Sequence, residues 1–105
     1  MGELRISSIL RDNIDIIESL EVNPRVCDVD VSVSSYRSTI RARIVHGTEI
    51  TPEEIRALLR EVCDGEGATL RTWTGTLEAD QVWNFAEATV ARDYGLTIEL
   101  SGVVK

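Results

Sequence analysis

The chain has few aromatic residues, two cysteines, one lysine and no long apolar segment. Aromatic residues make up 5% of it, so its core must be built mainly from Ile, Leu and Val. Cys27 and Cys63 are too few for the disulfide framework of a small secreted domain. Neither a run of about 18 apolar residues nor a basic stretch leading into an apolar one is present. These absences predict a soluble, cytoplasmic protein.

Acidic residues outnumber basic ones by 18 to 11, which gives a formal net charge of −7. This charge disfavours binding to the phosphates of nucleic acid or to anionic lipid, because both kinds of binding need cationic side chains. It argues against a membrane partner and against nucleic acid, and it permits a basic partner protein.

The length of 105 residues predicts one domain, residues 1–105. A hydrophobic content of 43% and a charged content of 28% are typical of globular proteins. A domain of this size buries roughly 60–70% of its unfolded surface, so its core needs no metal or disulfide. We expect no cofactor.

The clearest local signal predicts a helix over residues 52–63. Thr51 is placed to cap it, Pro52 takes its first position, and Glu54 completes a capping box. A second helix is predicted over residues 8–21, with Ile and Leu along one side. Asn13 falls among these apolar residues and needs a hydrogen-bond partner there. We predict a local structural role for this amide; the alternative is contact with a partner chain.

Residues 27–33 and 39–46 alternate apolar and polar side chains and predict a β-hairpin. Because Tyr36 and Arg37 do not favour a two-residue turn, we predict a four-residue loop over residues 35–38. The register that follows pairs Val33 with Ile40, Val29 with Ile44, Asp30 with Arg43, and Cys27 with His46.

The remaining sequence predicts a strand over residues 68–75, a helix over residues 78–94 and a strand over residues 96–100. Strands with a readable alternation have one polar face each, which is not expected for a sheet covered on both sides. We therefore predict an α+β two-layer sandwich with a four-stranded mixed sheet and helices on one face. The predicted order is α-β-β-α-β-α-β.

The helix-free face of this sheet is the predicted interaction surface. If Leu70 points into the core, Arg71 and Trp73 point away from it, onto the polar face of the hairpin. An exposed Trp beside Arg is common at protein interfaces. An ordinary solvated face and a nucleic-acid platform are the alternatives. The candidate interaction residues are Trp73, Arg71, Arg41, Arg43, Asp30 and Tyr36.

Cys27, His46 and Cys63 offer thiol and imidazole groups that serve as nucleophiles or metal ligands. They lack the short ligand spacing of a zinc site, and both cysteines fall in phase with core residues. No two carboxylates are spaced for acid–base catalysis. We therefore favour core packing and predict no catalytic residue and no metal site.

Three functional hypotheses remain. The favoured one is a non-enzymatic protein–protein interaction module, for example a small regulator or inhibitor of a larger assembly. It binds through the helix-free face or by homodimerisation. The second is an acidic, phage-type inhibitor that imitates nucleic acid on a basic host-defence enzyme. The third is a small metal or thiol protein built on Cys27, His46 and Cys63.

Overall fold

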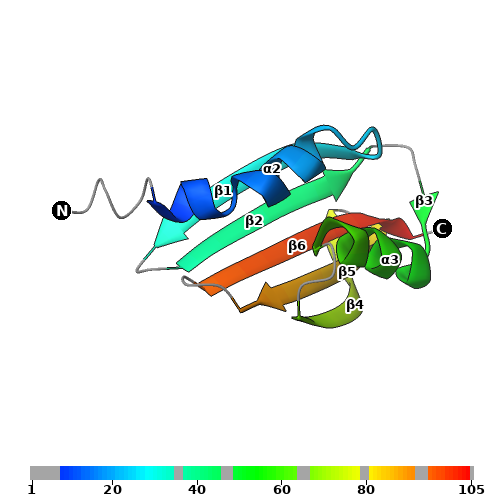
Figure 1. Ribbon diagram of the computed structural model, residues 1–105. Coiled ribbons are helices and arrows are strands. Elements are labelled where there is room, and N and C mark those ends of the chain that lie inside the picture. The colour runs from blue at the N-terminus through cyan, green and yellow to red at the C-terminus, as the bar shows by residue number, and fades with distance from the viewer. Residues whose placement is uncertain are drawn as a thin grey trace.

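The computed structural model describes residues 8–34, 37–45, 49–63, 67–78, 81–91 and 95–104. The elements are α2 (Ile14–Glu21), β1 (Val26–Ser34), β2 (Arg37–Ile44), β3 (Glu49–Ile50), α3 (Pro52–Cys63), β4 (Ala68–Glu78), β5 (Gln81–Val90) and β6 (Gly95–Val104) (Figure 1). Residues 8–12 are also helical, and a turn at Asn13 separates them from α2.

The six strands form one mixed sheet in the order β1-β2-β6-β5-β4, and β3 pairs with the end of β6. β6 runs parallel to β2 and β3 and antiparallel to β5. The predicted α+β class and mixed sheet are confirmed. The predicted number of four strands is wrong, and the observed order α-β-β-β-α-β-β-β differs from the predicted one.

The segment predicted as a helix, residues 78–94, contains strand β5 instead. Its sequence places Val82, Trp83, Ala86 and Val90 at helical spacing, which explains the error. In the strand, Asn84, Ala86, Ala88 and Val90 are buried. Because Asn84 is polar, the sequence does not show a regular alternation of apolar and polar residues. Asn84 Nδ2 donates a hydrogen bond of 2.8 Å to the Ile50 carbonyl. Pairing with β4 and β6 on both edges then outweighs the local pattern.

The β1–β2 hairpin forms, but its predicted register is wrong. The strands pair Ser34 with Arg37 and Asp30 with Arg41, a shift of two residues toward the turn. A shift of two residues keeps every side chain on its face, so apolar alternation cannot distinguish the two registers. A bulge between Cys27 and Asp30 then pairs Cys27 with Arg43 rather than with His46.

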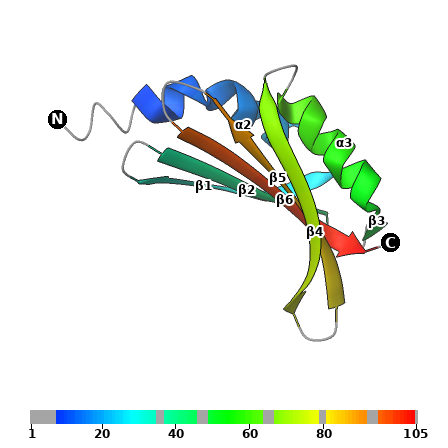
Figure 2. The same ribbon diagram turned by 90° about the horizontal axis from the view of Figure 1, so that it is seen from below.

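Both helices cover the same face of the sheet (Figure 2). The core between the layers is built mainly from buried Ile, Leu, Val and Ala side chains of α2, α3 and the strands. The predicted capping box of α3 is present, because the Glu54 amide donates to Thr51 Oγ1 and the Thr51 amide donates to Glu54 Oε1, both at 3.2 Å.

The buried amide of Asn13 has the local structural role that the sequence predicted. Its side chain is 2% exposed, and Nδ2 donates a hydrogen bond of 2.8 Å to Ser38 Oγ, which is also buried. This hydrogen bond joins the N-terminus of α2 to the beginning of β2, so it orients α2 on the sheet.

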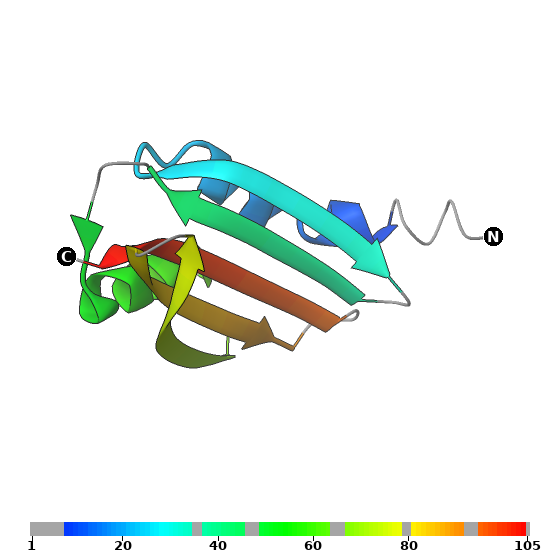
Figure 3. The same cartoon turned by 180° about the vertical axis from the view of Figure 1, so that it is seen from behind.

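Burial along the central strand β6 shows that only one face of the sheet belongs to the core. Leu96, Ile98 and Leu100 are buried beneath the helices, whereas Thr97 and Glu99 on the opposite face are partly exposed. No helix of the described residues covers that opposite face (Figure 3). We call it the helix-free face.

Candidate functional site

Five charged residues, one from each long strand, form a continuous row across the helix-free face. Arg71 pairs with Glu87, Glu87 with Glu99, Glu99 with Arg41, and Arg41 with Asp30. Residues paired directly across strands point to the same face of a sheet. We call these five residues the charged row.

Arg71 and Trp73 form the most defined cluster on this face. Arg71 Nε donates a hydrogen bond of 2.9 Å to Glu87 Oε1, and its guanidinium lies 4.7 Å from the centre of the Trp73 ring. Trp73 stacks on Phe85, with ring centres 5.3 Å apart and planes 7° from parallel. Trp73 nevertheless stays 36% exposed. We call Arg71, Trp73 and Phe85 the aromatic cluster.

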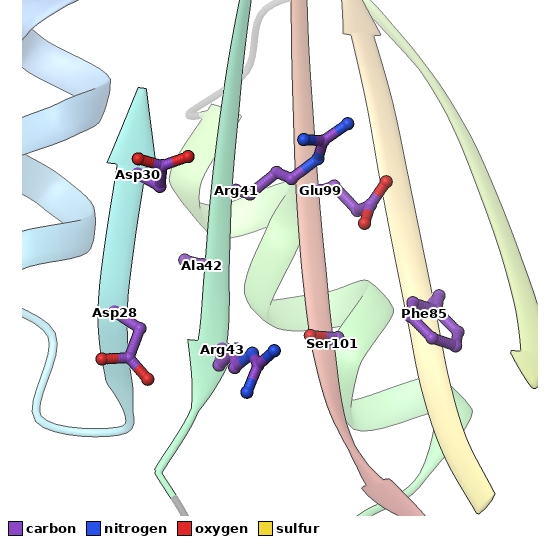
Figure 4. A pocket seen from close by; sticks show the side chains of 8 residues that line it. All are labelled: Asp28, Asp30, Arg41, Ala42, Arg43, Phe85, Glu99 and Ser101. Carbon is purple, nitrogen blue, oxygen red and sulfur yellow. The ribbon is translucent and has the colours of Figure 1, made fainter. Parts of the chain in front are cut away.

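A groove of about 410 Å³ lies on the same face. Its lining residues are Asp28, Asp30, Arg41, Ala42, Arg43, Phe85, Glu99 and Ser101 (Figure 4). The acidic side chains of β1 stand on one side and Phe85 on the other, with arginines of β2 between them (Figure 4). We call it the sheet groove; it connects the charged row to the aromatic cluster through Glu99 and Phe85.

The bulge in β1 shapes one wall of the sheet groove. Two residues, Asp28 and Val29, stand between Cys27 and Asp30, where β2 has only Ala42 between Arg43 and Arg41. Asp28 has a φ of 52°, a conformation that Asp tolerates better than most residues. Strict alternation predicted Cys27 on the core side, and this is wrong, because the bulge reverses the phase of the strand there.

Carboxylates and arginines are nearly balanced among the described residues of the helix-free face. The acids are Asp28, Asp30, Glu49, Glu87 and Glu99, and the bases are Arg37, Arg41, Arg43 and Arg71. Because the chain as a whole carries a formal charge of −7, most of its surplus acids lie on other surfaces. Four of them line the N-terminal helical segment: Asp12, Asp15, Glu18 and Glu21.

The structure places five of the six candidate residues on the helix-free face. Arg41, Arg43 and Asp30 lie together at the sheet groove. Arg71 and Trp73 lie on β4, with β5 and β6 between them and the arginines of β2, so they are not the direct neighbours that the sequence suggested. Tyr36 lies outside the described residues.

The residues of β5 on this face, Phe85 and Glu87 among them, were missed because their segment was predicted as a helix. The alternation of Phe85, Glu87 and Thr89 with Ala86, Ala88 and Val90 is the signal that would have found them. It spans six residues, which is long enough for a strand and too short to exclude a helix.

The proposed cysteine–histidine constellation is not assembled as the sequence suggested. Cys27 pairs with Arg43, Cys63 is buried at the end of α3, and His46 lies outside the described residues. Within the described ranges, no three His, Cys, Asp or Glu side chains gather closely enough to hold a metal ion.

No protein-family model matches the chain, and no curated protein matches its sequence. In the part of the chain that the structure describes, no helix has the length and apolar character needed to span a membrane.

Proposed function

We propose that this chain is a non-enzymatic protein-binding module that uses its helix-free face. The observation that carries this proposal is the aromatic cluster, in which a 36% exposed Trp73 is held between Phe85 and Arg71. Trp and Arg are the residues that most often dominate binding energy at protein interfaces. Holding them in place before binding reduces the entropy that binding would cost.

The surroundings of the aromatic cluster support a protein partner over nucleic acid. A nucleic-acid ligand needs an excess of cationic side chains, and an imitation of nucleic acid needs an excess of carboxylates. The helix-free face has neither excess to a marked degree, because four arginines stand against five carboxylates among its described residues. Mixed charges around an aromatic anchor suit a protein surface of complementary pattern.

Site-specific photo-crosslinking in the native host tests the proposal. A diazirine side chain at Thr89, an exposed position of the helix-free face, is expected to give covalent adducts with a protein. The same side chain at Arg56, exposed on α3, is the matched control and is expected to give few. If Thr89 gives no protein adduct of any kind, or no more than Arg56, the proposed function is wrong.

A further inference from the structure

The five long strands are arranged symmetrically about β6. β6 is the middle strand of the path β1-β2-β6-β5-β4, with two strands on each side. Consider a two-fold axis parallel to β6 and midway between two stacked sheets. This axis sets β4 of one copy against β1 of the other, β5 against β2, and β6 against β6. Because the rotation moves no residue along the strands, every cross-strand row faces the same row of the second copy.

The charged row is complementary to its own reverse. From β4 to β1 it reads Arg71, Glu87, Glu99, Arg41 and Asp30. Under the rotation, Arg71 faces Asp30 of the second copy and Glu87 faces Arg41 of the second copy. Each of these contacts occurs twice, and only Glu99 faces a like charge, its own copy. Complementary charges of this kind select a partner and fix its register.

The next row along the strands fits the same rotation. It contains Trp73, Phe85, Ser101 and Arg43, and ends at the bulge that carries Asp28. The rotation places Phe85 over Arg43 of the second copy, where a guanidinium and an aromatic ring attract each other. Trp73 comes to lie over the bulge. Ser101 falls on the axis, where its small side chain permits the approach of about 10 Å that stacked sheets adopt.

We infer that the partner of the helix-free face is a second copy of this chain, packed face to face about an axis parallel to β6. The inference rests on the proposed function, because it identifies the occupant of that face. An axis in the same plane but perpendicular to the strands would set Arg71 against Arg71, so the charges select the parallel axis.

The bend of the β4–β5 hairpin agrees with this arrangement. Its far end turns away from the helices, toward the side of the helix-free face (Figure 2). The rotation brings this end to the β1–β2 side of the second copy. Each hairpin therefore extends beside its partner rather than away from it.

Two charge-reversal variants, Asp30→Arg and Arg71→Asp, test the inference by sedimentation and native mass spectrometry. Each variant alone sets like charges against each other twice, so its dimer is expected to be at least about 10-fold weaker than that of the wild type. In an equimolar mixture, a heterodimer keeps the wild-type pair at one contact and has the same pair with exchanged charges at the other. A one-to-one heterodimer of nearly wild-type affinity is therefore expected. Both side chains are exposed, and thermal melts check that each variant folds.

Glu99 and Glu87 provide a second test that needs no mixing. Glu99→Gln removes the like-charge contact on the axis and is expected to tighten the wild-type dimer about 2- to 10-fold. Glu87→Gln removes an opposite-charge contact and is expected to weaken it. The reverse order of these two affinities contradicts the proposed axis.

The outcomes separate this inference from the proposed function. A wild-type protein that stays monomeric at submillimolar concentration, or variants whose mixture does not recover the dimer, overturns the inference. If Thr89 then crosslinks to a different protein, the helix-free face is still a protein-binding surface. If Thr89 crosslinks to no protein, both proposals fail.

Discussion

Replacing Ile98 with Ala is expected to lower the free energy of unfolding by about 2–5 kcal/mol. Ile98 is 0% exposed and lies at the centre of β6, beneath the helices and between Ile40 and Ala88 of the neighbouring strands. The smaller side chain loses apolar burial and leaves a cavity. Because β6 is paired with a strand on both edges, its backbone cannot readily move to close this cavity. Equilibrium unfolding in urea measures the loss.

The preceding residue on the same strand is the matched control. Thr97 points to the helix-free face and is only partly buried, so Thr97→Ala is expected to cost at most about 1 kcal/mol. The difference between the two variants measures how one-sided the core is. Equal losses for Ile98→Ala and Thr97→Ala would contradict a sheet that is covered on one face alone.

Replacing Trp73 with Ala is expected to have the largest effect on binding. A Trp that anchors an interface typically contributes at least about 2 kcal/mol, so the affinity for the partner crosslinked at Thr89 should fall about 30-fold or more. The chain loses the Trp73–Phe85 stack, worth about 0.5–1.5 kcal/mol, together with the burial of the covered part of the Trp73 ring. Sedimentation measures the affinity, and urea unfolding measures the stability.

Val22 offers a control for the loss of an exposed apolar side chain. It is 79% exposed at the end of α2, away from the helix-free face. Val22→Ala is expected to leave the affinity unchanged. A similar loss of affinity in both variants would show that Trp73 is not an anchor of the interface.

Sequence patterns predicted the elements whose signals are local. The capping box of Thr51 and Glu54 determined where α3 begins, and both hydrogen bonds are present. The alternation of Leu96, Ile98 and Leu100 identified the core side of the last strand, and all three are buried. Because period-two patterns record which face is buried, the helix-free face was also predictable.

Features that depend on distant parts of the chain were not predictable. β5 is a strand because β4 and β6 pair with it on both edges, and its own residues fit a helix almost as well. The hairpin register depends on the turn and on a bulge beside Cys27, neither of which apolar alternation records. The charged row needs the strand order, since Glu87, Glu99 and Arg41 come from three separate segments.

Quenching of Trp73 fluorescence by acrylamide tests the central claim most directly, in a Trp83→Phe variant that leaves Trp73 as the chain's single tryptophan. In dilute protein, Trp73, which is 36% exposed, should be quenched readily, whereas Trp83 in a Trp73→Phe control is 5% exposed and should be protected. When the partner crosslinked at Thr89 is bound, quenching of Trp73 should fall to the level of that control. Protection of Trp73 already in the dilute monomer, or equal quenching in the free and bound states, would contradict an open helix-free face that a protein partner covers.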